Sequence, residues 1–324
     1  MARLNRSLLI RWILGIAIVT YLLTLIDFRE FAQVLSKAHW GFVLLACVLV
    51  FIDRCWMGFK WQILLKAQGL GVSVSECIRV YFVSSFVGLV LPSSVGGDLV
   101  RLFSLSVPKG EREKVAASLV VEKLLSMMAL LLLVMFCILL LVMHSAVAQW
   151  KYFLIALGVF IGLGLGMIVS FLYVPVERFK NTKNPLFQKI AKVVLAYQEF
   201  RNYRKAMAIF FVISFFEQFM PFIFNYTLVK GFDLPGGALT YFMIVPMVYM
   251  IARLPISVDG LGVLETLYVV LFPLVGLNKT QALLLALASR IVTTVSHLLG
   301  GVFYFWKKPK IDNILNTNDL EKST

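Results

Sequence analysis

Arg290 is the clearest candidate for chemistry in this 324-residue chain, because it lies inside a long apolar run. It shares one helical face with polar residues at spacings of three, four and seven: Thr293, Thr294 and His297. If the run crosses a bilayer, a central charge costs roughly 2.5 to 3.5 kcal/mol and must face protein or water. A guanidinium group there can hold a phosphate through paired hydrogen bonds. The alternative is an ion pair with Glu217 or Glu265 that serves packing alone.

Two short blocks in different halves of the chain share a pattern of proline, glycine and charge. They read Pro92-Ser-Ser-Val-Gly96-Gly97-Asp98-Leu-Val-Arg101 and Pro255-Ile-Ser-Val-Asp259-Gly260-Leu-Gly262-Val-Leu-Glu265. A broken helix leaves backbone N–H and C=O groups that protein, water or a ligand must satisfy. A helix restarting after Gly97 would present its positive end, which suits a phosphate. Paired interruptions in two halves indicate a transporter-like site, and two structural kinks are the alternative.

Arginines and acidic residues in the apolar runs predict a polar, substrate-binding cavity. Its members are three arginines and three counter-charges: Arg101, Arg253, Arg290, Glu122, Glu217 and Glu265. Arg253 can hold a phosphate or extend to the membrane interface. Asp98 and Arg101, three residues apart, can pair directly, or Asp98 can cap a helix.

The acidic residues and the histidine of this set allow more than one role. Glu122 and the lysine after it point about 100° apart on a helix, and we expect Glu122 to face inward. Glu217 can pair with a basic residue or carry a coupling proton. His297 can relay protons or pack through a hydrogen bond.

The composition shows what kind of fold must position these residues. Apolar residues make up 60% of the chain and charged residues 15%, so the chain could not cover a soluble surface. We expect an all-α polytopic membrane protein of about eight hydrophobic segments, two of them broken or re-entrant helices in a pseudo-repeat. The apolar run 80–91 is too short to cross about 30 Å as a helix. One transmembrane domain is expected over residues 1–310, followed by a polar tail over 311–324.

The 31 lysines and arginines outnumber the 17 acidic residues and gather on alternate flanks of the apolar runs. The positive-inside rule then places both termini in the cytoplasm and the chain in an inner membrane. Segment 176–206 is predicted to be a cytoplasmic basic amphipathic segment, which lies on the anionic leaflet or forms a solvated connector. Four charged residues over 60–79 predict another aqueous connection.

Signatures of enzymes, metal sites and nucleic-acid binding are missing from the sequence. HExxH, GxSxG and Walker A patterns do not occur, and the four cysteines form no CxxC pair. We therefore expect no metal, no cofactor and no enzymatic activity of the chain itself. The basic surplus is assigned to anionic lipid headgroups rather than nucleic acid. Without an ATP site, uphill transport would need an ion gradient.

The two blocks also carry a family resemblance. The residues that carry it are Pro92, Gly96, Gly97, Asp98, Arg101, Pro255, Gly260, Gly262 and Glu265. The chain resembles the transmembrane-domain family of lysylphosphatidylglycerol synthase, also called flippase-like, over about residues 8–306. The pair Glu122–Lys123 fits too, although the family often has arginine at the second position. The family often has Gly-Gly where this chain has Asp259-Gly260, and the added charge puts the polarity of the substrate in question.

The resemblance implies lipid translocation, in which a headgroup crosses through the polar cavity while acyl or prenyl chains stay in lipid. An aminoacyl phospholipid or a polyprenyl-linked glycolipid would be such a substrate, and the lipid class does not transfer between members. The soluble aminoacyl-transfer domain of full synthases is not expected, since 18 residues follow Trp306. The alternatives are a membrane subunit serving a separate soluble transferase and a non-transporting regulator of lipid synthesis. The oligomeric state stays open.

Overall fold

The computed structural model describes residues 27–90, 94–144, 185–253 and 260–306, with short stretches of 16–24 and 154–169. Every regular element in these ranges is a helix, and the prediction of an all-α polytopic membrane protein is confirmed. Several predicted features lie outside the described residues: Pro92, Pro255, Asp259, the segment 176–184 and the tail 311–324.

Four stretches of the described chain are long and apolar enough to cross a bilayer. They are α3 (Trp40–Ala67), α6 (Arg112–His144), the pair α10 (Arg204–Glu217) and α11 (Met220–Gly231), and α14 (Lys279–Trp306). Pro221 lies in the first turn of α11, where its missing N–H ends the hydrogen-bond ladder of α10. Short 3₁₀ turns lie at Lys109–Glu111, Phe200–Asn202 and Phe272–Val275.

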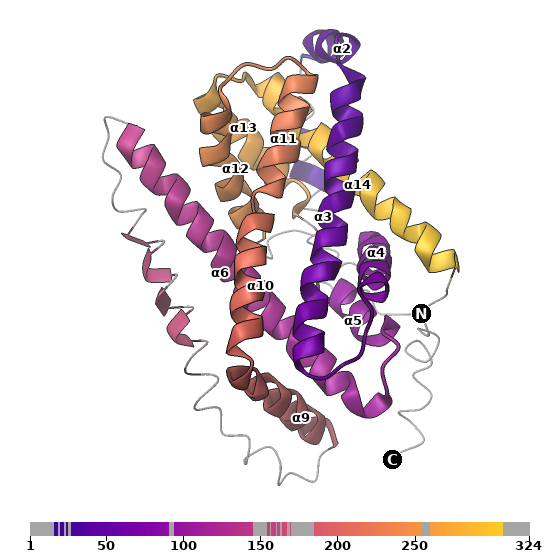
Figure 1. Ribbon diagram of the computed structural model, residues 1–324. Helices are drawn as coiled ribbons and strands as arrows, with labels where there is room; N and C mark the ends of the chain where they lie inside the picture. Colours follow the sequence, from indigo (N-terminus) through magenta and orange to yellow (C-terminus); the bar gives the residue numbers. More distant parts are fainter. Residues whose placement is uncertain are drawn as a thin grey trace. The chain divides into compact units, whose positions relative to one another are not determined.

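Two pairs of shorter helices form around the proline–glycine blocks (Figure 1). In the first half, α4 (Val74–Val90) packs against α5 (Ser94–Ser104), and in the second half α12 (Ala238–Ala252) packs against α13 (Val263–Leu271). At 1.5 Å per residue, even the 17 residues of α4 reach only about 25 Å, less than the hydrocarbon thickness. The second half of the chain thus repeats the order of the first: a long helix, a short pair and a long helix.

Contacts within the chain group it into two compact units, each with its own buried core. Unit 1 comprises Met1–Asp53, Lys123–Ser170 and Ala208–Ser296, and unit 2 comprises Arg54–Glu122, Phe171–Met207 and His297–Thr324. The core of unit 1 includes Tyr241, Tyr268 and Phe272. The core of unit 2 includes Trp61 and Val80.

Two predictions about local structure are wrong. Residues 60–67 are not an aqueous connection but the last turns of α3, in which Lys60 is 1% exposed and Trp61 is fully buried. The aliphatic stem of a lysine packs on apolar surface, so one charge does not end a buried helix. Helix α5 begins at Ser94, so Gly97 lies inside it and Asp98 does not cap it. A Cβ atom added at Gly97 would lie 3.6 Å from the carbonyl oxygen of Ser84 on α4, which is ordinary van der Waals contact.

Helix α4 is held by close backbone contacts on two sides within unit 2. A Cβ atom at Gly58 of α3 would lie 2.6 Å from the Cα atom of Ile78. A Cβ atom at Gly300 of α14 would overlap the carbonyl oxygen of Phe82. Helices approach this closely only where glycine replaces larger residues. These two glycines therefore fix the backbone of α4 next to Tyr81.

Helix α9 (Pro185–Glu199) carries part of the basic amphipathic segment, and its C-terminal half packs on unit 2. Ala196, Tyr197 and Phe200 are buried, and the Nε2 atom of Gln68 donates a hydrogen bond to the Ala196 carbonyl at 3.0 Å. The amphipathic pattern is therefore explained here by contact with protein. Contact of the segment with the anionic leaflet stays a prediction.

Helix α2 (Phe28–Ser36) is tied to the start of α14 within unit 1. The carboxylate of Asp27 caps α2 by accepting the N–H groups of Arg29 and Glu30. The Asp27 N–H donates to the hydroxyl of Thr280 at 3.2 Å, and Asn278 Nδ2 donates to Glu30 Oε1 at 2.7 Å. These bonds join residues about 250 positions apart along the chain.

Candidate functional site

An arginine–carboxylate pair joins α13 to α14 in unit 1. Glu265 lies in the first turn of α13, and its side chain is fully buried. Its Oε1 atom accepts a hydrogen bond from Arg290 Nε, and its Oε2 atom accepts the Gly262 N–H at 2.8 Å and Arg290 Nη2 at 3.3 Å. Both oxygens of Glu265 are therefore satisfied. Of the two carboxylates that the sequence offered to Arg290, the structure pairs it with Glu265.

The same arginine reaches the break between α12 and α13. Arg290 Nη2 donates to the carbonyl oxygen of Gly260 at 3.2 Å. Gly260 and Gly262 have backbone φ angles of +67° and +79°, which residues other than glycine rarely adopt. The arginine thus satisfies a backbone group that the break leaves outside a helix. Arg290 keeps 22% of its side-chain surface exposed, so the cation is the accessible member of this pair.

A second buried polar cluster connects four helices of unit 1. Its members are Asn225 on α11, Tyr249 on α12, Tyr268 on α13 and Ser289 on α14. Tyr268 donates to Asn225 Oδ1 at 2.6 Å, and Asn225 Nδ2 donates to the Tyr249 hydroxyl at 3.2 Å. The Tyr249 and Ser289 hydroxyls lie 3.3 Å apart. Because Tyr268 and Ser289 share helices with Glu265 and Arg290, this cluster fixes the two helices that form the ion pair.

Arg253 and Glu217 meet through an amide at the end of α10. Arg253 Nη2 donates to Gln218 Oε1 at 3.0 Å, and Gln218 Nε2 donates to Glu217 Oε2 at 3.0 Å. Glu217 and Gln218 are each 2% exposed. The structure therefore brings two predicted site residues, Arg253 and Glu217, together through Gln218, which lies between them.

The predicted polar face of α14 does not act as one surface. The Thr293 hydroxyl donates to the carbonyl groups of Ser289 and Arg290 in its own helix. Thr294 and His297 are half-buried, and the Nε2 atom of His297 makes no hydrogen bond within the described part of the chain. Arg290 on this face hydrogen-bonds to Glu265 of α13, whereas His297 lies beside Arg54 of α3.

The first proline–glycine block forms an ion pair in unit 2. Arg101 on α5 pairs with Glu122 on α6 at 3.0 Å and with Asp98, one turn earlier, at 3.2 Å. The side chains of Arg101 and Glu122 are 5% and 6% exposed, against 23% for Asp98. The direct pairing of Asp98 with Arg101 is thus the alternative that the structure shows. The accessible member of this cluster is an acid, in contrast to unit 1.

Two aromatic residues that the sequence interpretation missed complete the cluster in unit 2. The Tyr81 hydroxyl on α4 donates to Glu122 Oε1 at 2.7 Å. The guanidinium carbon of Arg101 lies 4.5 Å from the ring centre of Tyr81 and 4.9 Å from that of Trp61. Trp61 Nε1 donates to the Ser118 hydroxyl at 3.1 Å. Aromatic faces attract a guanidinium group most strongly where water is excluded.

The two ion pairs occupy corresponding places in the two halves, with their charges exchanged. In the first half, the short helix α5 carries the arginine and α6 the carboxylate. In the second half, the short helix α13 carries the carboxylate and α14 the arginine. The partners are 21 and 25 residues apart along the chain. Arg101 belongs to unit 2, and Arg253 and Arg290 belong to unit 1. That the three arginines line one cavity stays a prediction.

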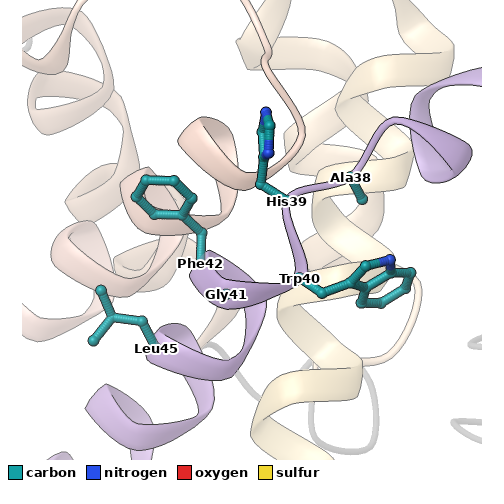
Figure 2. Close-up of a pocket in the computed structure, with 6 residues that line it drawn as sticks. All are labelled: Ala38, His39, Trp40, Gly41, Phe42 and Leu45. Atoms are coloured by element: carbon teal, nitrogen blue, oxygen red, sulfur yellow. The ribbon is translucent and has the colours of Figure 1, made fainter.

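A hollow of about 520 Å³ lies where α2 turns into α3. It is lined by Ala38, His39, Trp40, Gly41, Phe42 and Leu45. Figure 2 shows Phe42 and Leu45 on one side of the start of α3 and Trp40 on the other. No carboxylate or guanidinium group lines it, so it suits an apolar chain rather than a charged headgroup. Within the described part of the chain, no three His, Cys, Asp or Glu side chains gather as metal ligands.

Known proteins match the chain along most of its length. The family model described as the lysylphosphatidylglycerol synthase TM region covers residues 12–301, which include both ion pairs. A UPF0104 membrane protein of Pyrococcus horikoshii is 21% identical over 321 residues, covering 90% of this chain and 94% of that protein. A UPF0104 membrane protein of Methanothermobacter thermautotrophicus is 19% identical over 304 residues, covering 87% and 89%. The family resemblance that rests on the two proline–glycine blocks is confirmed.

Proposed function

Because the chain belongs to the family of the lysylphosphatidylglycerol synthase TM region, we propose that it is a lipid translocase. The substrate is a phosphate-bearing lipid, such as an aminoacyl phospholipid or a polyprenyl-linked glycolipid, moved between the leaflets of an inner membrane. The observation that carries the proposal is the pair of interrupted helices, each joined to the next long helix by a buried arginine–carboxylate pair. Interrupted helices in corresponding halves are typical of secondary transporters.

Arg290 is the residue that we assign to the lipid phosphate. Its side chain is partly exposed, and Glu265 and the Gly260 carbonyl hold the guanidinium group in a fixed orientation. Guanidinium groups bind phosphate oxygens through paired, charge-assisted hydrogen bonds. The buried carboxylate of Glu265 offsets part of the positive charge. Phosphate binding is therefore weak enough for release on the other side, as transport requires.

The flanking charges assign the two short pairs to different sides of the membrane. Arg79 and the basic residues of segment 109–114 flank the α4–α5 pair, which we expect to enter the bilayer from the cytoplasm. Apart from Arg253 in its own break, the α12–α13 pair is flanked by Lys230 and Lys279, and we expect it to enter from the opposite side. With both termini in the cytoplasm, each leaflet then has an interrupted helix pair near its headgroups.

Leaflet-resolved transport in proteoliposomes tests this function. Fluorescent anionic, aminoacylated and polyprenyl-phosphate lipids are reconstituted with the purified protein, and a membrane-impermeant quencher reports the outer leaflet. We expect protein-dependent movement of at least one lipid class, with or without a pH gradient. Arg290→Ala should slow it about tenfold or more, because each charge-assisted hydrogen bond contributes about 1.5 to 3 kcal/mol.

Two variants control for loss of structure. Arg201→Ala removes an exposed arginine outside both ion pairs and should transport at the wild-type rate. Arg290→Lys keeps a positive charge next to Glu265, so this variant should fold. It should transport slowly, because an ammonium group cannot form the paired hydrogen bonds of a guanidinium group to a phosphate. Wild-type transport by Arg290→Ala would refute the assigned role. If no lipid moves, with or without the pH gradient, the translocase proposal fails. Co-purification with a soluble transferase would then favour a membrane subunit of a lipid-modifying enzyme.

A further inference from the structure

Glu122 and Glu265 occupy corresponding places in the two halves, yet their carboxylates are satisfied differently. Both oxygens of Glu265 accept hydrogen bonds. In Glu122, Oε1 accepts hydrogen bonds from Arg101 and Tyr81, whereas Oε2 is buried and has no hydrogen-bond partner within the described part of the chain. A buried oxygen that shares a negative charge without a donor is energetically costly.

We propose that Glu122 binds and releases a proton at Oε2, which makes the cluster in unit 2 the proton-coupling site of transport. The inference rests on the proposed function, because coupling presupposes that a lipid moves. On uptake, a proton from water forms an O–H bond at Oε2 and the carboxylate loses its negative charge. On release, that bond breaks and the proton returns to water.

The surroundings of Oε2 favour a proton over a larger cation. Tyr81 and Arg101 contact the carboxylate, Trp61 packs on both of them, and the three residues are 8%, 4% and 0% exposed. A metal ion or an ammonium group would need space among these side chains and would be repelled by the guanidinium group 3.0 Å from Oε1. A proton adds almost no volume and removes the negative charge that Oε2 shares without a hydrogen-bond donor.

The charged and titratable groups that face Glu122 come from each helix around it. Cys77 and Tyr81 on α4 and Arg101 on α5 interact with Glu122 directly. Asp98 on α5 interacts with Arg101, and Arg54 on α3 interacts with Tyr81 and with His297 on α14. Asp98 is decisive, because it pairs with Arg101 at 3.2 Å and keeps that cation neutralised when Glu122 is protonated. Protonation of Glu265 would instead weaken the three hydrogen bonds that its carboxylate accepts from N–H groups.

Protonation changes how α5 is held. The ionised Glu122 attracts Arg101 across the contact between α6 and α5. The neutral form keeps a hydrogen bond but loses most of the Coulomb attraction, while Asp98 holds Arg101 within α5 itself. Proton uptake therefore loosens the short helix pair from the long helix, which links a proton gradient to a conformational change.

Infrared difference spectroscopy after a pH jump tests the site without any lipid substrate. The full chain is placed in bilayers of neutral lipid, and acidification should produce a protonated-carboxyl C=O band that shifts in D₂O. Glu122→Gln should abolish this band, whereas Glu265→Gln should retain it. Tyr81→Phe should move the band to higher frequency, because it removes a hydrogen bond to the C=O oxygen. This variant also tests the site if Glu122→Gln does not fold.

Persistence of the band in Glu122→Gln, or an unmoved band in Tyr81→Phe, would overturn the proposal. The transport assay separates it from the proposed function. Lipid movement in the wild type that a pH gradient accelerates, and that loses this acceleration in Glu122→Gln, supports both. Lipid movement with the band intact in Glu122→Gln leaves the translocase standing and removes the proton site. A band lost in Glu122→Gln without movement of any lipid supports proton binding and refutes the translocase.

Discussion

Gly300→Ala tests how closely α14 approaches α4 in unit 2. A Cβ atom at position 300 would lie 2.7 Å from the carbonyl carbon of Phe82 and 2.9 Å from the Cβ atom of Phe86. Ordinary van der Waals contact begins at 3.4 Å. The two helices must therefore separate by roughly 1 Å. The atoms of Phe82 belong to the backbone of α4, so no side-chain rotation relieves the clash.

The expected destabilisation follows from two opposing terms. Overpacking a close-packed contact costs about 1 to 3 kcal/mol, and a clash with backbone lies near the upper end of that range. Alanine gains about 1 kcal/mol over glycine in a helix. The net loss in the free energy of unfolding is thus about 1 to 2 kcal/mol. For a chain of 324 residues, that loss lowers the melting temperature by about 1.5 to 3 °C.

Thermal unfolding of the purified protein, followed by tryptophan fluorescence, measures this change. Gly88→Ala is the matched control, since an added Cβ atom there meets nothing within 4 Å. This control should keep or raise the melting temperature. The displacement in Gly300→Ala should also weaken the bond from Tyr81, next to Phe82, to Glu122, and so slow transport. A Gly300→Ala melting temperature at or above the wild-type value would refute the described contact.

Other substitutions test single contacts. Asn225→Leu removes hydrogen bonds to Tyr268 and Tyr249 and should lower the free energy of unfolding by about 3 kcal/mol, measured by thermal unfolding. Gly262→Ala must adopt a φ of +79°, which should cost about 1 kcal/mol and slow transport by disturbing the N–H that Glu265 accepts. Asp27→Ala removes the cap of α2, costs about 1 kcal/mol and should speed proteolysis within α2 while transport stays unchanged.

Each of these substitutions has a result that contradicts the structure. An unchanged melting temperature of Asn225→Leu would mean that the tyrosine hydroxyls do not depend on the asparagine. Normal transport and stability of Gly262→Ala would exclude the left-handed backbone at that residue. Equal proteolysis of Asp27→Ala and the wild type would show that the cap does not hold α2.

The class of fold follows from the sequence because apolar content and run length decide it, whereas the ends of helices depend on tertiary contacts. The charge of Lys60 led us to expect an aqueous connection, yet the residue lies in α3 and its side chain is buried. Gly96 and Gly97 led us to expect a helix start after them, yet α5 begins at Ser94 and packs against α4. In both places, packing against a neighbouring helix outweighs a local preference.

The candidate site could be predicted only as a set of charges. Arg101, Glu122, Glu265 and Arg290 stand out because a charge in an apolar run needs a reason. Which arginine pairs with which glutamate could not be predicted from the sequence, because the partners lie on different helices. Tyr81 and Trp61 give no signal at all, because an aromatic residue in an apolar segment looks like ordinary core. A hydroxyl bonded to a carboxylate 41 residues away is visible only in three dimensions.

The bonds between α2 and the start of α14 set an order of events during synthesis. The hydrogen bond from Asp27 to Thr280 cannot form until the ribosome has added Thr280, 253 residues later. At roughly 5 to 20 residues per second, this delay lasts about 12 to 50 seconds. During that time the earlier helices enter the bilayer while Glu30 still lacks Asn278. Insertion of individual helices therefore precedes closure of unit 1, and α2 stays open to proteases and membrane chaperones until the start of α14 is made.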